Sequence, residues 1–400
     1  MANNSKLSKA KNAKNDEFYT QWVDIEKEVQ AYLDYAPDVF KGKTILCPCD
    51  DPYESNFFKY FALRFNDLGL KKLIATCYAG SPIANTQLSL FADEPVEDRT
   101  TKSPHKIEIT EVGDYNNDGS FDLKDIEWLL ENKKNVLTRL EGNGDFRSDE
   151  VRKLRDEADV IVTNPPFSLF REFFMWIMQA NKSFIVIANK NCVTYKEVFP
   201  FILKNKIWSG ITGWGGGMWF ESKNLDNVDK VIDGIGMKNV ASIFLSNLEH
   251  GRRHQSLPLM TMADNLRYNN GLKKKLEDKR EYDTYDNYDA IDIPYTDAIP
   301  SDYNGAMGVP ISFLEKYCPE QFEIIALGNS RENFTPIKNY VNPKKIMKDG
   351  KIVNGGAINC VLAIETDVEP QGQTYYTSDN SKYLIPPYAR IIIKHKRVTK

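Results

Sequence analysis

Short apolar runs and amphipathic segments alternate along the first part of the chain. Lys43–Pro48 (KTILCP) and Lys72–Cys77 (KLIATC) are apolar runs with the length of a buried strand. Between them, apolar residues from Phe57 to Leu68 recur at helical spacing, and Gly69 ends the predicted helix. This order predicts a strand–helix–strand unit with parallel strands.

The alternation resumes after a polar segment. Residues 81–140 are polar and contain prolines, whereas Asp159–Thr163 (DVIVT) and Ser183–Ala188 (SFIVIA) are again predicted strands. Ser168 is the predicted cap of the helix between these two strands. We therefore predict an α/β fold in which residues 16–250 form a Rossmann-like, doubly wound sheet, interrupted by an insertion at about 81–140.

The pattern weakens after residue 250. Residues 250–310 are rich in Asn, Asp, Tyr, Lys and Pro. Residues 321–327, 357–364 and Arg390–Lys394 are predicted short strands. We predict that residues 251–400 form a smaller, irregular α+β C-terminal domain.

Composition argues against several classes of protein. No apolar run approaches the roughly 20 residues that a membrane span needs. Residues 1–15 are polar and lysine-rich, which indicates a disordered arm rather than a secretory signal. The six cysteines form no CxxC pair, which argues against a zinc site and a disulfide scaffold. These features fit a cytoplasmic protein without a membrane partner.

The charge is uneven although the net charge is only −4. Basic residues cluster at Arg252-Arg253, at Lys273–Lys275 and in the tail from Arg390 to Lys400. Such clusters can follow the phosphates of a nucleic acid even in an acidic protein. A solvated protein surface is the alternative interpretation of each cluster.

The tetrapeptide Asn164-Pro165-Pro166-Phe167 comes directly after the predicted strand DVIVT. Ligands of a parallel sheet bind beyond the carboxyl ends of its strands. The two prolines remove N–H donors, which leaves the carbonyls of the Asn164 side chain and the Pro165 backbone as acceptors. Phe167 adds an aromatic face. The segment therefore suits a planar base that carries an NH2 group, although an Asn-Pro turn can also be purely structural.

Two acceptors of this kind bind both amino hydrogens and draw the nitrogen lone pair out of conjugation. The nitrogen is then oriented toward a sulfonium methyl group, and positioning and electrostatics supply most of the catalysis. No strong base is needed, because the proton becomes acidic once the nitrogen is alkylated. A base stacked in a duplex cannot reach such a pocket, so base flipping is implied.

Several segments resemble the EcoRI-type family of adenine-specific DNA methyltransferases. They are CDDPYESNFFKYFA (49–62), GNGDFRSDE (142–150), VTNPPFSLFREFF (162–174) and GVPISFLEKYCPEQFEII (308–325). The resemblance extends from Asp16 to about Lys396. It implies a methyltransferase domain at 16–250, a DNA target-recognition domain at 251–400, and Asn164–Phe167 as the catalytic residues. It also implies S-adenosylmethionine as methyl donor and N6 of adenine in double-stranded DNA as acceptor.

The resemblance also implies a set of donor-binding residues. Tyr19 and Thr20 resemble the motif that touches the methionine end of the donor, although a helix start capped by Asp16 is the alternative. Asp145 resembles the residue that accepts from the donor's adenine amino group, with Phe146 packed on that ring. An ordinary loop is the alternative for this pair.

The turn after the first strand is the expected place of the donor's amino-acid part and ribose. Pro48, Asp50, Asp51 and Ser55 are the candidate residues there, and Asp51 or Ser55 can also cap the following helix. The usual G-x-G of this turn is absent, and the second strand ends at Cys77 without an acidic residue. The residue that holds the ribose therefore stays open.

Two further segments have two interpretations each. Gly213–Phe220 (GWGGGMWF) is either a mobile loop that closes on the flipped base or a turn with buried aromatics. Asp114–Asp125 follows the calcium-loop pattern D-x-N-x-D-G and is otherwise an Asx-rich turn. We assign no metal ligand in this chain.

The acceptor has alternatives as well. An N-P-P-aromatic segment also serves N-methyltransferases that act on guanine in RNA or on a glutamine amide in a protein. A binding protein that retains the fold without activity is a third hypothesis, against which the intact Asn164 and Asp145 argue. The leading hypothesis is a site-specific DNA adenine methyltransferase. It acts either beside a cognate restriction endonuclease for the same site or as a solitary enzyme.

Overall fold

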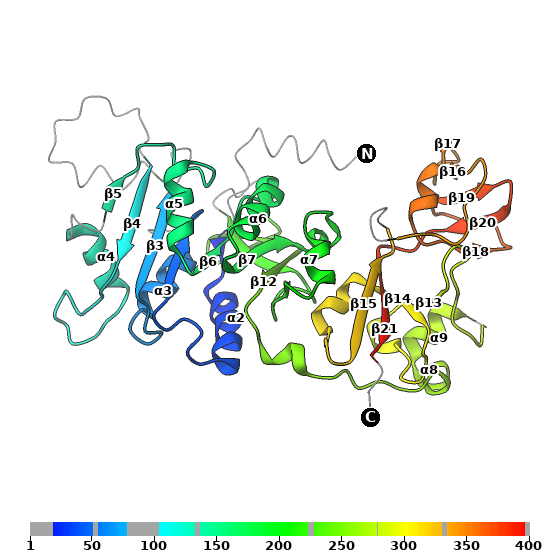
Figure 1. Ribbon diagram of the computed structural model, residues 1–400, viewed down its shortest axis with the longest axis horizontal. Helices are drawn as coiled ribbons and strands as arrows, with labels where there is room; N and C mark the ends of the chain where they lie inside the picture. Colours follow the sequence, from blue (N-terminus) through cyan, green and yellow to red (C-terminus); the bar gives the residue numbers. More distant parts are fainter. Residues whose placement is uncertain are drawn as a thin grey trace. The chain divides into compact units, whose positions relative to one another are not determined.

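The computed structural model describes residues 19–50, 55–77, 104–132, 137–222, 228–277, 279–329 and 334–396 (Figure 1). The chain divides into two compact units. The N-terminal unit comprises Met1–Lys190 and Ile207–Gly251, and the C-terminal unit comprises Asn191–Lys206 and Arg252–Lys400. Helix α7 (Phe199–Leu203) thus belongs to the C-terminal unit, whereas the sequence pattern placed it within residues 16–250.

A mixed sheet forms the centre of the N-terminal unit. Within the described residues its strand order is β5-β4-β3-β2-β6-β7-β12-β8. The strands are β2 (Thr44–Cys47), β3 (Lys72–Cys77), β4 (His105–Ile109), β5 (Leu137–Arg139), β6 (Val160–Thr163), β7 (Ser183–Asn189), β8 (Trp208–Ser209) and β12 (Ser242–Ser246). The apolar runs predicted as strands form β2, β3, β6 and β7, which pair in parallel. β4 runs antiparallel to β3, and β12 runs antiparallel to β7.

Helices cover both faces of this sheet. Helices α2 (Trp22–Tyr35), α3 (Asn56–Leu63) and α4 (Leu123–Asn132) share one core with alternate strand residues such as Ile45, Leu73 and Val162. Helices α5 (Asp149–Glu157) and α6 (Phe170–Gln179) lie on the opposite face, where Phe174 contacts Phe184 of β7. Successive residues of a strand point to opposite faces of the sheet. When helices cover both faces, all residues of the strand are buried, and its sequence is an unbroken apolar run.

The predicted cap of helix α6 is wrong. Ser168 lies inside a 3-10 turn, Phe167–Leu169, and α6 begins after Leu169 without a side-chain cap. Helix α6 therefore begins at Phe170, one residue later than a serine cap at Ser168 would place its start.

The segment predicted as an insertion belongs in part to the sheet. Between residues 105 and 139 the chain adds β4 and β5 to the sheet edge, and α4 buries Ile126 and Leu129 in the shared core. The sequence pattern hid this role, because β4 reads HKIEI, with only every second residue buried.

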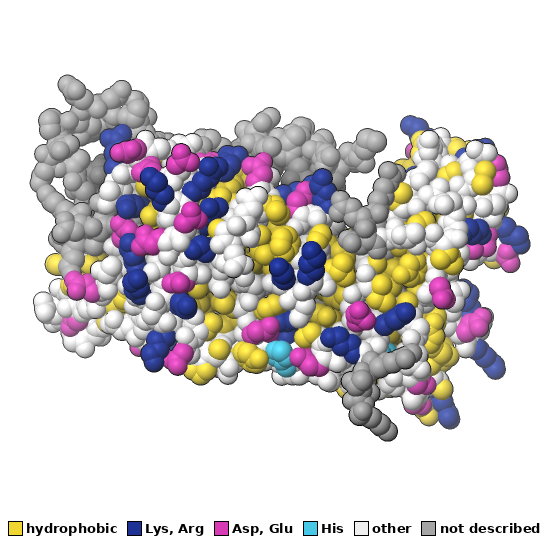
Figure 2. All heavy atoms as spheres, in the orientation of Figure 1, with side chains coloured by type: hydrophobic (Ala, Val, Ile, Leu, Met, Phe, Trp, Pro, Cys, Tyr) yellow, Lys and Arg dark blue, Asp and Glu magenta, His cyan; other side chains and the backbone are white. Residues whose placement is uncertain are grey.

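A small antiparallel sheet completes the N-terminal unit. In the described residues its order is β1 (Tyr19–Thr20), β9 (Met218–Ser222), β11 (Ile235–Val240) and β10 (Lys230–Ile232). Thr20 pairs with Phe220, so the start of the described chain lies beside the strand that follows the glycine-rich segment. On the face shown in Figure 2, basic and acidic side chains lie intermingled over the left part of the N-terminal unit.

The C-terminal unit has two sheets and short helices, and is therefore α+β. As far as the chain is described, one sheet has the order β13 (Ala290–Asp292), β14 (Ala306–Pro310), β21 (Arg390–His395) and β15 (Phe322–Leu327). The other is β17 (Ile352–Asn354), β16 (Lys344–Ile346), β19 (Tyr375–Ser378), β20 (Ser381–Ile385) and β18 (Ile364–Thr366) (Figure 1). The helices other than α7 are α8 (Met262–Tyr268) and α9 (Asn270–Leu276).

Two of the three short strands predicted here are confirmed, as β15 and β21. The third is wrong, because residues 357–364 begin with a 3-10 turn, Gly356–Cys360, and only Ile364 enters a strand. Ile358 and Leu362 are apolar because they fill the cores of the C-terminal unit, and not because the backbone is extended.

Two arginines of the predicted basic clusters form ion pairs within the fold. Arg390 is largely buried, with its Nε 2.8 Å from Oδ1 of the buried Asp292. β21 lies between β14 and β15, so the tail begins as an interior strand of a sheet. Arg252 likewise pairs with Glu315, at 2.8 Å. These two arginines serve the fold, whereas Lys273–Lys275 are exposed on α9. No helix among the described residues has the length and apolar character of a membrane span.

Candidate active site

The turn after β2 and the end of β6 lie side by side. β2 and β6 are adjacent and parallel, so their carboxyl ends meet at one edge of the sheet. Asp50 is buried there, and its carboxylate accepts a hydrogen bond from Ser55 Oγ at 2.7 Å and another from the hydroxyl of Thr163, the last residue of β6. A predicted donor-binding residue is thus linked directly to the residue before Asn164.

Ser55 has two roles in this turn. Its hydroxyl oxygen accepts from the backbone N–H of Phe58 at 3.3 Å and caps helix α3, while its proton goes to Asp50. Asp51, the other predicted cap and donor ligand, lies outside the described residues. The serine therefore fixes the start of α3 relative to the Asp50 carboxylate.

The same turn is tied to β3. Pro48 is buried, and its carbonyl accepts from Thr76 Oγ1 at 3.0 Å. The hydroxyls of Thr76 and Thr163, each near the carboxyl end of a neighbouring strand, thus hold a turn that lacks the usual glycines. Sequence analysis missed both threonines, although a threonine at the end of a buried strand is a usable signal.

The thiols of Cys47 and Cys49 lie in surroundings that disfavour their ionised form. Burial raises the pKa of the Cys47 and Cys49 thiols, and the nearby Asp50 carboxylate raises them further. The thiols therefore stay protonated at neutral pH and are poor nucleophiles.

The tetrapeptide Asn164–Phe167 leaves the sheet at the end of β6, as predicted. Asn164 is half-buried and Pro165 is buried. Phe167 opens the 3-10 turn and packs partly against the core that α2 and α3 share with the sheet. The segment is thus held by packing on one side, with the Asn164 amide at the carboxyl edge.

Thr20 lies close to the same turn. Its carbonyl accepts from Asn56 Nδ2 at 2.8 Å, and Asn56 is the first residue of α3, next to Ser55. Within the described part of the chain, Thr20 Oγ1 is buried without a hydrogen-bond partner. Tyr19 pairs with Glu221 through the backbone of β1 and β9. The structure thus brings Thr20, Ser55 and Asp50 together.

Asp145 and Phe146 both have contacts within the protein. The Asp145 carboxylate accepts from Arg147 Nε at 2.8 Å and Nη2 at 2.7 Å, and this guanidinium lowers the pKa of Asp145. Phe146 is buried against α6, with its ring centroid 5.2 Å from that of Phe173. Arg147 also pairs with Glu172 at 3.0 Å. A role for Asp145 toward the donor therefore requires it to share its acceptors with Arg147.

The glycine-rich segment Gly213–Phe220 is anchored at this edge of the sheet. Gly213 has a φ of +108°, and a Cβ there would lie 2.4 Å from the carbonyl oxygen of Ser242. Ser242 pairs with Asn189 at the carboxyl end of β7. Trp214 is buried, and its carbonyl accepts from Lys190 Nζ at 2.7 Å. This start of the segment matches the turn with buried aromatics better than the mobile loop.

A carboxylate that sequence analysis missed fixes the two residues before Gly213 by hydrogen bonds. Glu28 is fully buried on α2 and accepts from the backbone N–H groups of Ile211 at 3.0 Å and Thr212 at 3.1 Å. It also accepts from the hydroxyl of Tyr32 at 2.7 Å. Burial raises the pKa of Glu28 to about 7. A glutamate on the apolar face of an amphipathic helix was the available signal.

In the possible calcium loop, Asp114–Asp125, the carboxylates accept hydrogen bonds from backbone N–H groups of the same loop. Asp114 accepts from Gly119 N at 2.9 Å, and Asp125 accepts from Tyr115 N at 2.7 Å. In the part of the chain that the structure describes, no group of three or more His, Cys, Asp or Glu side chains is arranged to hold a metal ion. The observed bonds are those of an Asx-rich turn.

Comparison with known proteins agrees with the geometry. The family described as adenine-specific methyltransferase EcoRI matches residues 6–396. The Type II methyltransferase M.EcoRI of Escherichia coli is 41% identical over 336 residues, which cover 81% of this chain and 89% of the relative. M.MpnI of Mycoplasma pneumoniae is 33% identical over 326 residues, covering 80% of this chain and 84% of the relative. M.MgeORF184P of Mycoplasma genitalium is 32% identical over 353 residues, covering 87% and 95%.

No solved structure matches the chain. The family match covers both compact units, including the Asn164–Phe167 segment and the turn at Asp50. The chain therefore belongs to the EcoRI family of adenine-specific methyltransferases.

Proposed function

We propose that this methyltransferase transfers a methyl group from S-adenosylmethionine to N6 of an adenine that is flipped out of double-stranded DNA at a specific sequence. The observation that carries this proposal is the link between the two halves of the site. Asn164 follows Thr163, whose hydroxyl donates to Asp50 in the turn at the end of the neighbouring strand. An acceptor-binding residue and a donor-binding turn are thus joined by one hydrogen bond.

The sheet is interpreted as a doubly wound, Rossmann-like methyltransferase sheet. From β2 the chain proceeds to β3 on one side and returns to β6 on the other, so the order reverses at β2. Ligands of such sheets bind where the order reverses, beyond the carboxyl ends of the strands. Asp50 and Asn164 both follow strands at this reversal.

The residues around β2 fit the methyl donor. Thr20 Oγ1 is a buried polar atom without a hydrogen-bond partner among the described residues, and Ser55, next to the Asn56 that bonds Thr20, donates to the Asp50 carboxylate. Hydroxyl and carboxylate oxygens suit the ammonium and ribose hydroxyls of S-adenosylmethionine. We assign Tyr19, Thr20, Pro48, Asp50, Asp51 and Ser55 to its amino-acid and ribose parts, and Asp145 and Phe146 to its adenine. When bound, it supplies an electrophilic methyl group on sulfur.

The acceptor side follows from Asn164-Pro165-Pro166-Phe167. The Asn164 side-chain carbonyl and the Pro165 backbone carbonyl accept the two hydrogens of the adenine N6 amino group, and Phe167 stacks on the ring. This orients the nitrogen lone pair toward the methyl group, and the charge that develops on nitrogen is stabilised by the two carbonyl dipoles. The proton leaves after alkylation, so no side chain with a strongly shifted pKa is required at this point.

The C-terminal unit is assigned to recognition of the DNA target. The relatives are named as Type II methyltransferases. By analogy, this enzyme protects a site that a cognate restriction endonuclease cuts, or it acts as a solitary methylase. The exposed lysines Lys273–Lys275 are available to contact phosphates.

The proposal is tested by transfer of a tritiated methyl group from S-adenosylmethionine to DNA, total RNA and a protein extract, in parallel. We expect label in DNA alone, as N6-methyladenine at one sequence in long-read modification maps. Label in RNA guanine or in a glutamine amide would replace the proposed acceptor. Donor binding without transfer to any of the three would indicate a binding protein.

A further inference from the structure

An irregular segment of the C-terminal unit presents alternate side chains to solvent. From Phe334 to Val341 the chain belongs to no strand, yet Phe334 and Tyr340 are buried while Ile337 and Val341 are 71% and 51% exposed. Asn339, between the latter two, is exposed as well. The segment thus has an inner face and an outer face.

Amide side chains from elsewhere hold its backbone in place of a neighbouring strand. Asn359 accepts from Tyr340 N at 2.7 Å and donates to Tyr340 O at 3.1 Å. Asn380 accepts from Val341 N at 3.0 Å and donates to Asn339 O at 3.0 Å. Four backbone groups of the consecutive residues 339–341 are therefore bonded to two asparagine side chains, which fixes the backbone without a neighbouring strand.

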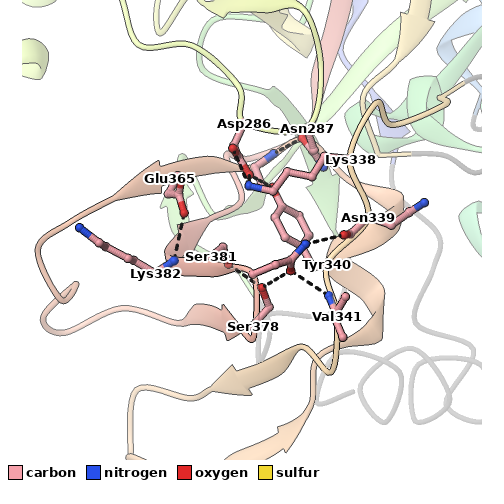
Figure 3. A network of polar contacts seen from close by, with 12 residues as sticks. Asp286, Asn287, Lys338, Asn339, Tyr340, Val341, Glu365, Ser378, Ser381 and Lys382 are labelled. Carbon is pink, nitrogen blue, oxygen red and sulfur yellow. Dashed lines mark hydrogen bonds and ion pairs between the residues drawn. The ribbon is translucent and has the colours of Figure 1, made fainter.

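The inner side chains add a second set of bonds. Asp286 accepts from Lys338 Nζ at 2.7 Å and from the hydroxyl of Tyr340 at 2.8 Å. Figure 3 shows Lys338 and Tyr340 converging on Asp286, while the Asn339 side chain points away from the network. Asn342 then turns the chain with a φ of +47° and donates to Asp379 at 2.6 Å. The outer side chains are thus presented by a rigid backbone.

The surroundings of this segment are basic. Residues 334–354 contain five lysines and one aspartate. After Pro343 the chain forms the hairpin of β16 and β17, on which Lys344, Lys348 and Lys351 are exposed. β17 is the edge strand of the five-stranded sheet, and all three of its residues are exposed. Exposed lysines on this edge hairpin suit the phosphates that line a groove of B-DNA.

The outer side chains have the chemistry of base recognition. An asparagine amide both donates and accepts, and it pairs with N6 and N7 of adenine in the major groove, while apolar side chains contact the thymine methyl group. Ile337, Asn339 and Val341 all lie on the outer face of the segment, which bends at Ile337–Lys338 and again at Val341–Asn342.

We propose that Thr335–Val341 reads the target sequence in the major groove, with Asn339 bonded to an adenine outside the flipped position and Ile337 and Val341 against thymine methyl groups. The lysines of the β16–β17 hairpin contact the flanking phosphates. This inference rests on the proposed function, because it requires that the substrate is double-stranded DNA. The rigid backbone lowers the ordering cost of binding and makes the readout specific.

The test compares the full-length wild type with Asn339→Ala and Asn339→Asp. Each protein is used to methylate a bacterial genome that lacks the modification, and long-read maps give rates for the cognate site and its single-base variants. We expect Asn339→Ala to lose tenfold or more of the discrimination at one A·T pair. We expect Asn339→Asp to favour C·G at that pair, because a carboxylate accepts from the cytosine amino group. Gln373→Ala removes another exposed amide of the same unit and serves as the control.

Thermal unfolding and the dissociation constant of S-adenosylmethionine are measured for each variant, and both should equal the wild-type values. Ile337→Ala and Val341→Ala provide a second test, since both side chains are exposed, and each should weaken discrimination at a neighbouring pair. Discrimination within twofold of wild type in all four variants would overturn the inference and leave the proposed function standing. A wild type that methylates no DNA would overturn both.

Discussion

The two segments that carry the proposed chemistry of this protein are held by different means. In the N-terminal unit, Asp50 and Asn164 stand where buried parallel strands end, and the hydroxyl of Thr163 joins them. In the C-terminal unit, Thr335–Val341 belongs to no strand and is held by the amides of Asn359 and Asn380. The first arrangement follows from a regular sheet, whereas the second depends on side chains that are distant in sequence.

This difference has a physical cause. A strand buried on both faces must be apolar throughout, so its end is marked by the first polar residue after the run. An irregular segment must satisfy its backbone groups individually, because no neighbouring strand supplies the partners. Segments of the first kind can be located from hydrophobicity, whereas those of the second kind require the tertiary structure.

Replacing Asn164 should have the largest effect, because it removes a catalytic acceptor at a strand end. We expect Asn164→Ala to lower the rate of methyl transfer by on the order of 10³-fold or more. Single-turnover transfer and donor affinity measure this, and the affinity should remain close to wild type. Asn66→Ala, at an exposed asparagine of the same unit, is the control. Appreciable transfer by Asn164→Ala would mean that the strand-end position is not catalytic.

Replacing Arg390 tests whether the C-terminal unit depends on polar contacts in its interior. Arg390→Met leaves Asp292 buried without its cation, and we expect the free energy of unfolding to fall by about 3–5 kcal/mol. Urea unfolding measures this change. Lys394→Met, at an exposed position of the same strand, should change it by less than about 0.5 kcal/mol. Equal effects of the two substitutions would contradict the role of the buried pair.

Glu28 combines both arrangements: it lies on the regular helix α2, and its carboxylate accepts hydrogen bonds from the backbone N–H groups of an irregular segment. Its pKa is about 7 in the folded protein and 4.5 without burial, so the folded state binds the proton more tightly. The stability that Glu28 contributes is therefore complete below pH 4.5 and is lost as the pH rises to about 7. The loss amounts to about 3 kcal/mol.

Glu28→Gln should remove this part of the pH dependence. The difference in unfolding free energy between wild type and variant should therefore fall by about 3 kcal/mol from pH 4.5 to pH 8. Glu26→Gln, exposed on the same helix, should show no such trend. A constant difference between wild type and Glu28→Gln would refute the argument.

The smallest effect is expected for a single lysine of the β16–β17 hairpin. Lys348→Gln should weaken DNA binding by less than about tenfold, equally for cognate and unrelated sequences, because phosphate contacts carry no sequence information. The slope of log affinity against log salt should decrease by about 0.9. Fluorescence anisotropy over a range of salt concentrations measures both. Lys204→Gln, an exposed lysine of the same unit, should leave the slope unchanged.

The sequence predictions succeeded for buried regular strands and failed where apolar residues lie in short or irregular segments. The runs 43–48, 72–77, 159–163 and 183–188 became the parallel strands of the sheet, because unbroken apolar runs leave few alternatives. Strand β4 was not predicted, since alternation over only five residues is weak. Residues 357–364 were predicted as a strand because apolar residues in a buried turn resemble those of a strand.

The sequence by itself determined the α/β pattern of the first 250 residues, the family, and the position of Asn164 after a strand. These depend on local composition and on motifs that are continuous in the chain. Only the tertiary structure decided that Thr76 and Thr163 hold the Asp50 turn, that Glu28 holds the segment before Gly213, and that Arg390 pairs with Asp292. Each of these is a hydrogen bond or ion pair between residues distant in sequence. Such contacts form only after the strands and helices have packed.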